Sequence, residues 1–226
     1  MIRLLRSVIP LVYRNRYRSA WNRLALESQI FFGKMSRLIR RRPLPKGADE
    51  QVNLHLGCGS VVHADFINID TIPGPHVHFV RKIDNLSIFA DRSVDLVYAC
   101  HCLEHFPYRN VPSVLREWFR VLKEGAILRL SVPDFDLLVQ MYNQSNMDAD
   151  MIAPPLMGGQ GNKYDFHCSI FTEPSLSRLL TGAGFREVRR WEPGSSKLTS
   201  FDDWSSRRIT LNNITFEISL NLEAVK

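Results

Sequence analysis

The chain has few cysteines and no long apolar segment. Its 226 residues include four cysteines, and no two of them form a CxxC pair. No apolar run approaches the roughly 20 residues that a helix needs to span a bilayer. The opening segment, MIRLLRSVIPLVY, is interrupted by Arg6 and Pro10 and lacks a small-residue cleavage site. We therefore expect a globular cytoplasmic protein with reduced thiols, without a secretory signal or a disulfide framework.

Acidic residues are scarce at the N-terminal end. Residues 1–42 hold ten arginines and one lysine but only one acid, Glu27, so they carry +10 and the remainder carries −4. Apolar residues interleaved with the arginines predict a basic amphipathic helix within an extension of residues 1–48, followed by a domain at 49–226. Two interpretations stay open. The helix packs its apolar side on the domain, or residues 1–42 contact an anionic membrane surface from the cytoplasmic side. No stacking or base-reading motif accompanies the charge, so we expect no nucleic-acid partner.

The segment VNLHLGCGSVVHADFINID, residues 52–70, lacks one glycine of a dinucleotide-binding turn. Gly57 and Gly59 follow the first apolar strand, but Val62 stands where the third glycine would be. Asp70 comes 13 positions after Gly57, whereas NAD sites place an acid about 20 positions on. The turn therefore predicts a nucleoside ligand without a pyrophosphate, with Asp70 accepting hydrogen bonds from its ribose. A nicotinamide-dependent oxidoreductase is the disfavoured alternative.

Strand and helix patterns alternate from Val52 onward, which predicts an α/β domain with a parallel sheet. The expected strands are 52–56, 66–70, 77–80, 94–100, 126–132, 185–191 and 214–225, the last of them antiparallel. The expected helices are 134–143, 111–123 closed by Gly125, and 172–182 begun by Thr172 and ended at Gly182 or Gly184. The long connection from 133 to 171 is expected to cover a substrate site, as loops of this length often do.

Several motifs resemble those of class I S-adenosylmethionine-dependent methyltransferases. They are LHLGCG, FINID, DNLSIFADRSVDLVYACHCLEHF and VLREWFRVLKEGAILRLSVPDF, and the resemblance extends over residues 51–226. The chain is most similar to a small bacterial subgroup encoded with surface-polysaccharide genes, through LMGGQ, DFH, FTEPSLSRLLTGAGF and RRWEPG. The resemblance implies a Rossmann-like fold with a seven-stranded, mostly parallel sheet, helices on both faces, and S-adenosylmethionine as cofactor.

The resemblance also implies which residues bind the cofactor. They are Leu56, Gly57, Cys58, Gly59, Asp70, Asp84, Asn85, Leu86 and His101. Gly57 to Gly59 would line its methionine part, Asp70 its ribose, residues 84–86 its adenine, and His101 its sulfonium. Two departures from the family pattern stand out: His55 replaces the usual acid before the turn, and the segment up to Phe66 is too short for a full first helix.

Histidine is the side chain best suited to accept a proton near neutral pH. His101, directly after the fourth strand, and His167, at the end of the long connection, are the catalytic candidates. A structural zinc site is not expected, since neighbouring thiols at Cys100 and Cys102 would point to different faces. The resemblance implies methyl transfer to an oxygen or nitrogen of a small-molecule or glycan-type acceptor, in polysaccharide biosynthesis. The alternative is a non-catalytic protein that binds S-adenosylmethionine and acts as a partner or regulator.

Overall fold

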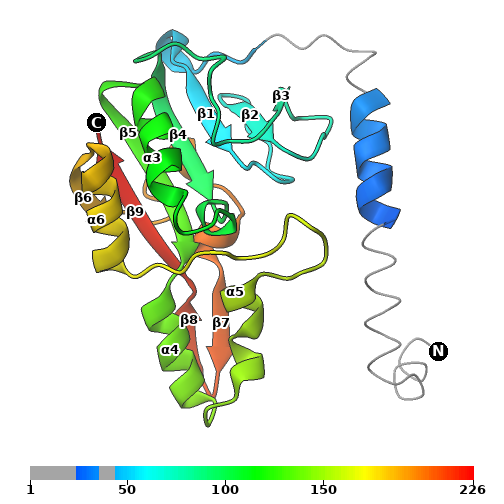
Figure 1. The fold of residues 1–226 in the computed structure, drawn as a ribbon, viewed down its shortest axis with the longest axis vertical. Coiled ribbons are helices and arrows are strands. Elements are labelled where there is room, and N and C mark those ends of the chain that lie inside the picture. Colours follow the sequence, from blue (N-terminus) through cyan, green and yellow to red (C-terminus); the bar gives the residue numbers. More distant parts are fainter. Residues whose placement is uncertain (1–23, 36–43) are drawn as a thin grey trace.

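The computed structural model describes residues 24–35 and 44–226, which are organised around a seven-stranded sheet (Figure 1). In the order in which they pair, its strands are β3 (Phe79–Val80), β2 (Ile67–Asp70), β1 (Asn53–Leu56), β4 (Val94–Cys100), β5 (Leu122–Pro133), β9 (Ser219–Val225) and β6 (Arg186–Arg190). The pairings from β3 to β5 are parallel, and β9 is antiparallel to both β5 and β6. The predicted mostly parallel sheet with an antiparallel C-terminal strand is therefore confirmed.

The strand order reverses between β1 and β4, and this reversal positions the site. From β1 the chain proceeds to β2 and β3 on one side, and then returns to β4 and β5 on the other. Leu56 pairs with Ala99, so the residues after β1 and after β4 emerge next to each other. Open α/β sheets bind ligands in the crevice at this reversal, outside the carboxyl ends of the strands.

One face of the sheet packs against α3 (Val111–Val121) and α6 (Glu173–Ala183). Five apolar side chains of α3 recur at helical spacing and are buried: Val111, Val114, Leu115, Trp118 and Val121. Helix α6 begins with the predicted cap, because Thr172 and Ser175 exchange side-chain-to-backbone hydrogen bonds. It ends at Gly184, whose φ of 111° suits glycine. Both predicted boundary signals of α6 are confirmed.

The other face carries aromatic and polar side chains and is covered by residues 192–207, which include the short helices η4 (Lys197–Thr199) and η5 (Trp204–Ser206). Phe201 packs on Tyr98 with ring centroids 4.6 Å apart, and the Tyr98 hydroxyl donates to the buried carboxylate of Asp203. No helix lies between the glycine turn and Phe66, as the length of that segment predicted. Buried hydrogen bonds and ring contacts therefore fasten the segment that covers this face.

The prediction of a single strand over residues 214–225 is wrong, because these residues form two strands that belong to two different sheets. β8 (Ile214–Glu217) pairs with β7 (Arg208–Leu211), and β9 begins at Ser219. The alternation of apolar and polar residues continues through Ile218, so periodicity alone cannot reveal the change of partner. The hairpin signal was present in Asn212 and Asn213, whose φ angles of 49° and 65° fit a tight turn.

The predicted end of the helix at 111–123 is also wrong. Helix α3 stops at Val121 and the chain enters β5 at Leu122, so Gly125 lies inside a strand instead of closing a helix. The pairing of β5 with β4 is irregular here, and Gly125 adopts a φ of 76°. A glycine in the sequence is compatible with a helix end or with a bulge inside a strand, so Gly125 alone could not show where the helix ends.

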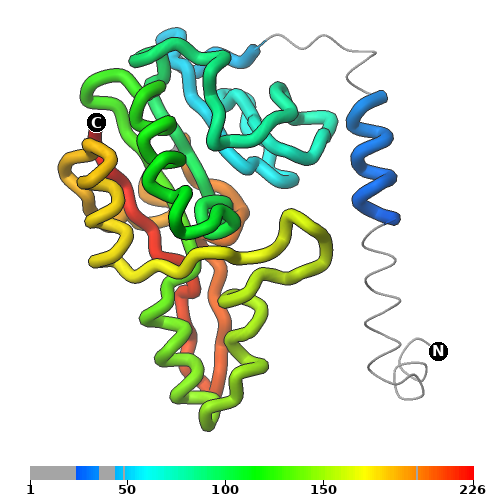
Figure 2. The backbone as a smooth tube through the Cα atoms, in the orientation of Figure 1, coloured from blue at the N-terminus to red at the C-terminus, as the bar shows by residue number. Residues whose placement is uncertain are grey.

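The long connection from 133 to 171 forms a separate layer at the carboxyl end of the sheet. It holds α4 (Phe135–Gln144), η3 (Ala149–Met151) and α5 (Ala153–Met157), and α4 packs with β8. Asp134 caps α4 by accepting hydrogen bonds from two backbone N–H groups, which confirms the helix predicted here. After α5 the chain makes a wide loop before it returns to α6 (Figure 2).

Only part of the predicted N-terminal helix lies within the described residues, where 24–35 are helical. Gly33 is buried against the loop after β2, since an added Cβ would come 2.4 Å from the carbonyl oxygen of Pro73. Four large apolar side chains of this helix are exposed instead of packing on the domain: Leu24, Phe31, Phe32 and Met35. No helix among the described residues has the length and apolar character needed to cross a membrane.

Candidate active site

The glycine turn after β1 is a backbone bend held by the neighbouring strand. The N–H groups of Gly57 and Cys58 both donate to the carbonyl oxygen of Ile69 in β2, at 2.9 and 3.3 Å. Gly57 and Gly59 adopt φ angles of 63° and 53°, which glycine tolerates best. A Cβ at Gly57 would lie 2.7 Å from the Cβ of Cys102, whereas a Cβ at Gly59 would meet no atom within 4 Å. The turn is therefore packed behind Gly57 and open in front of Gly59.

Asp70 at the end of β2 faces this turn. Its Oδ2 accepts a hydrogen bond of 2.8 Å from the Gly59 N–H, and its Oδ1 accepts one of 2.8 Å from the Ile72 N–H. Each oxygen of an ionised carboxylate can accept a second hydrogen bond. Asp70 can therefore fix the turn and still accept hydrogen bonds from two ribose hydroxyls.

The predicted adenine contacts lie on the loop between β3 and β4, which α3 supports. Asp84 and Asn85 are exposed, whereas the Leu86 side chain is buried and its N–H donates to Glu117 at 2.6 Å. The indole N–H of Trp118 donates to the Ile83 carbonyl oxygen at 2.8 Å. Leu86 therefore belongs to the core through its side chain, and only its backbone and its two exposed neighbours can face a ligand.

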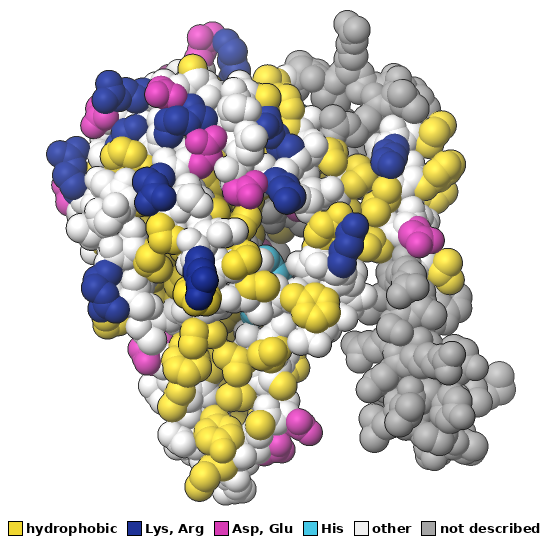
Figure 3. Space-filling model, viewed as in Figure 1, with side chains coloured by type: hydrophobic (Ala, Val, Ile, Leu, Met, Phe, Trp, Pro, Cys, Tyr) yellow, Lys and Arg dark blue, Asp and Glu magenta, His cyan; other side chains and the backbone are white. Residues whose placement is uncertain are grey.

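A cavity of about 700 Å³ opens at the carboxyl ends of β1 and β4. Its walls come from the glycine turn, the end of β4, η2 (Leu103–His105), the 133–171 connection and residues 202–209. Figure 3 shows histidine atoms inside a hollow between the upper part of the molecule and a largely apolar lower part. Of the predicted cofactor residues, Gly57, Cys58, Gly59 and His101 line this cavity, while Leu56, Asp70, Asp84, Asn85 and Leu86 do not.

His101 follows β4 directly and has an unusual backbone. Its φ of 48° lies in the left-handed region, which few non-glycine residues adopt but which histidine tolerates better than most. Ser219 donates its hydroxyl proton to the Trp204 carbonyl oxygen, so it accepts the hydrogen bond of 2.7 Å from His101 Nε2. His101 Nδ1 then faces Glu104 Oε1 at 3.3 Å. The ring is thus fixed with Nε2 bonded to Ser219 and Nδ1 directed at the Glu104 carboxylate.

Glu104 is the functional candidate that the sequence did not single out. Its side chain is 0 % exposed and contacts His101 Nδ1 at 3.3 Å, with no shorter hydrogen bond to either carboxylate oxygen. Burial raises the pKa of this carboxyl, but the hydrogen bond and charge of His101 and the charge of His105 outweigh burial and lower the pKa below its ordinary value. The backbone carbonyl of Glu104 accepts hydrogen bonds from Cys168 and Ser169, as expected for a turn residue. Its side chain, however, remains an ionised group available to the site.

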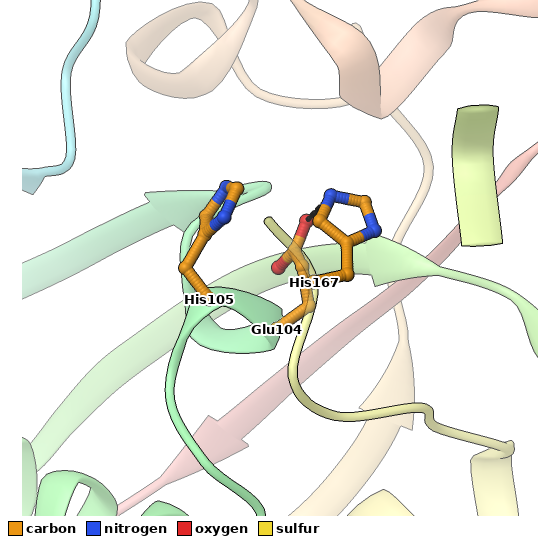
Figure 4. A group of neighbouring side chains, drawn as sticks. All are labelled: Glu104, His105 and His167. Carbon is orange, nitrogen blue, oxygen red and sulfur yellow. Dashed lines mark ion pairs between the residues drawn. The ribbon is translucent and has the colours of Figure 1, made fainter. Parts of the chain in front are cut away.

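His105 and His167 face this carboxylate from two sides (Figure 4). His105 Nδ1 bonds the Phe166 carbonyl oxygen at 3.0 Å, and His167 Nδ1 bonds the Pro155 carbonyl oxygen at 3.0 Å. Because a carbonyl oxygen only accepts, both Nδ1 atoms carry the proton, and both Nε2 atoms carry lone pairs when the rings are neutral. Burial lowers the pKa of His167, so its ring is neutral near pH 7.

The four cysteines and the two tryptophans near the cavity differ in burial. Cys58 and Cys102 are buried, Cys100 is half-buried and Cys168 is exposed, and all four thiols are free. Burial raises the pKa of Cys58, Cys100 and Cys102, so these thiols stay protonated. Trp191 packs in the core beside Tyr98, while Trp204 is exposed and lines the cavity.

His55, which replaces the usual acid, is buried among aromatic rings and stacks on Phe201 at 5.1 Å. Burial lowers its pKa to about 4, from 6.5 in the unfolded chain. Between pH 6.5 and 4 the unfolded state therefore binds a proton that the folded state rejects, so stability falls as pH falls. The loss should reach about 3 kcal/mol, at ~1.4 kcal/mol per pKa unit.

We expect denaturant unfolding at pH 7, 6, 5 and 4 to show this loss, and His55→Gln to have a correspondingly flatter pH profile. Equal pH profiles for the two proteins would contradict the assignment of this acid sensitivity to His55.

Comparison with known proteins identifies the family. A family model described as a methyltransferase domain matches residues 33–189, so the chain belongs to the methyltransferase domain family. Together with the fold this makes it a class I methyltransferase, and S-adenosylmethionine is its cofactor. The turn fits this cofactor, because Gly59 leaves open space where a side chain would stand and Asp70 has free lone pairs beside it. A comparison with curated proteins found no match.

Among solved structures, three methyltransferases resemble this chain at low sequence identity. A SAM-dependent methyltransferase from Archaeoglobus fulgidus is 17% identical with a TM-score of 0.49, over 78% of this chain and 86% of that one. Another from Methanosarcina mazei is 21% identical with a TM-score of 0.47, over 77% and 91%. A Burkholderia thailandensis 1,6-didemethyltoxoflavin-N1-methyltransferase, solved with 1,6-didemethyltoxoflavin and S-adenosylhomocysteine, is 16% identical with a TM-score of 0.48, over 97% and 91%.

Proposed function

We propose that the chain transfers a methyl group from S-adenosylmethionine to an oxygen or nitrogen of a small-molecule or glycan-type acceptor. The observation that carries this proposal is the cavity of about 700 Å³ that joins the glycine turn to the histidines beneath the 133–171 connection. A volume of this size suits a small ligand. Its lower part provides the space in which an acceptor would meet the cofactor.

The protein's own contribution is to align the acceptor, exclude water and accept a proton. When bound, the cofactor supplies an electrophilic methyl group on a sulfonium. Gly57 to Gly59 and Asp70 would hold this cofactor, the cavity walls would align the acceptor atom with the methyl group, and the acceptor's proton would pass to His101. Glu104, 3.3 Å away, stabilises the imidazolium, and Ser219 holds the opposite nitrogen. His167, from the 133–171 connection, contacts the acceptor.

Transfer of tritium from labelled S-adenosylmethionine to a panel of acceptors tests this function. The panel should contain sugar nucleotides, lipid-linked sugars, small phenols and amines, since the similarity to polysaccharide-associated methyltransferases suggests a glycan. Labelling of a sugar or another small molecule supports the proposal. Tight binding of S-adenosylhomocysteine without transfer to any acceptor class would favour the non-catalytic alternative.

We also propose that the N-terminal segment brings the enzyme to an anionic membrane surface. Phe31 and Phe32 are 60% and 65% exposed on a helix that lies within the chain's most basic segment. Replacing both with serine in the full chain should reduce co-flotation with anionic liposomes, while Val62→Ser, an equally exposed apolar position on the domain, should leave it unchanged. Equal flotation of the two variants would count against this role.

A further inference from the structure

Glu104, His105 and His167 form a cluster of electron-pair donors, and His101 Nδ1 contacts the Glu104 carboxylate at 3.3 Å from the side. One ligand atom from each lies within 4.8 Å of the others, and Glu104 Oε1 is 3.8 Å from His167 Nε2. Figure 4 shows the carboxylate between the two rings, with Glu104 and His105 from η2 and His167 from the segment after α5. Three acceptor atoms at this distance repel one another unless a cation or a proton lies among them.

Hydrogen bonds fix the orientation of both rings from outside the cluster. In each ring Nδ1–H donates to a backbone carbonyl oxygen, of Phe166 for His105 and of Pro155 for His167, which leaves Nε2 directed inward. Metal-binding histidines typically donate their other N–H in this way, and the outer bond sets both the tautomer and the ring orientation. The carboxylate completes the set, since it is fully buried and its contact with His101 Nδ1 at 3.3 Å leaves lone pairs on both oxygens.

We propose that Glu104, His105 and His167 bind one divalent cation of the zinc or manganese class. Two imidazoles and one carboxylate with an open position are the donor set of catalytic zinc sites and of facial metal triads. Both histidines line the cavity, so the open position faces the acceptor space. If the chain is the methyltransferase proposed above, the cation holds the acceptor oxygen and eases loss of its proton to His101.

The proposed cation site also predicts a movement of His167. Metal–ligand bonds of about 2.0–2.2 Å place ligand atoms closer together than 4.8 Å, so the cation would draw His167 toward η2. That movement tightens the segment 158–171, whose one basic residue, Lys163, is exposed and offers a tryptic site. Zinc should therefore slow cleavage after Lys163.

The test is calorimetric titration of the chelator-treated full chain with ZnCl₂, MnCl₂ and MgCl₂. The same titrations are made on Glu104→Gln, His105→Asn and His167→Asn. His63→Asn serves as the control, because His63 lies outside the cavity lining. We expect one equivalent of Zn²⁺ or Mn²⁺ to bind wild type and the control, weaker binding of Mg²⁺, and at least about tenfold weaker binding in the three site variants. Zinc should protect Lys163 in wild type but not in those variants.

Absence of stoichiometric binding, or equal binding by the three variants and wild type, overturns the proposal and leaves a protonated histidine–carboxylate network in its place. S-adenosylhomocysteine is titrated in parallel. Its binding without cation binding rejects the metal site and leaves the methyltransferase intact, whereas cation binding without S-adenosylhomocysteine binding rejects the function and leaves the metal site.

Discussion

Replacing His101 with asparagine should lower the rate of methyl transfer by about 10²- to 10⁴-fold, the usual contribution of a positioned proton acceptor. The affinity for S-adenosylhomocysteine should change little, because the glycine turn and Asp70 do not depend on this ring. His101 is the one proposed catalytic group that directly follows a strand at the reversal point, and Ser219 fixes its Nε2.

Asparagine is the informative replacement because it adopts positive φ angles readily, and His101 has a φ of 48°. Loss of activity would then reflect the missing imidazole instead of a displaced backbone. His63→Asn serves as the matched control, since His63 does not line the cavity and should retain full activity. Unchanged transfer by His101→Asn in single-turnover measurements would remove His101 from the mechanism.

Trp118→Ala should lower the free energy of unfolding by about 3–5 kcal/mol, as truncation of a large buried aromatic residue does. The side chain is 0% exposed between α3 and the sheet, and its indole N–H donates to Ile83. The substitution leaves a cavity in the core and also removes the hydrogen-bond donor of the Ile83 carbonyl oxygen. Urea unfolding measures the loss.

The same tryptophan connects the core to the expected adenine loop. With Glu117 and Arg120, it holds the backbone of residues 83–89 through hydrogen bonds from α3. Trp118→Phe, which keeps most of the volume but removes the N–H, should cost about 1 kcal/mol and still weaken S-adenosylhomocysteine binding. If Trp118→Phe is destabilised while its affinity equals that of wild type, this loop does not contact the adenine.

The sequence was most informative where local signals and tertiary structure agree. The glycine turn, the Thr172 cap and the antiparallel final strand each follow from residues within a few positions of one another. The division between β8 and β9 could not be predicted, because Phe216 and Leu220 continue one alternation while they pack in different clusters. Pairing partners are a property of the whole sheet.

In the candidate site, too, some residues could be placed from the sequence and others only from the fold. The sequence positions of His101 after a strand and of His167 at the end of a long connection allowed both to be placed beside the cavity. Glu104 was not, because its environment depends on residues 166–169, about 60 positions later, returning to cover η2. Only the fold shows that this turn residue buries an ionised carboxylate between two rings.

Affinity for S-adenosylhomocysteine measured on Gly59→Ala and Gly125→Ala tests the central claim most directly. Both glycines have positive φ angles, 53° and 76°, and at neither would a Cβ meet an atom within 4 Å, so the two substitutions carry similar backbone strain of about 1 kcal/mol. Gly59→Ala should weaken binding at least about tenfold, Gly125→Ala should bind like wild type, and NAD should bind to none of the three. Equal affinities in all three proteins would show that the bend after β1 does not receive the cofactor.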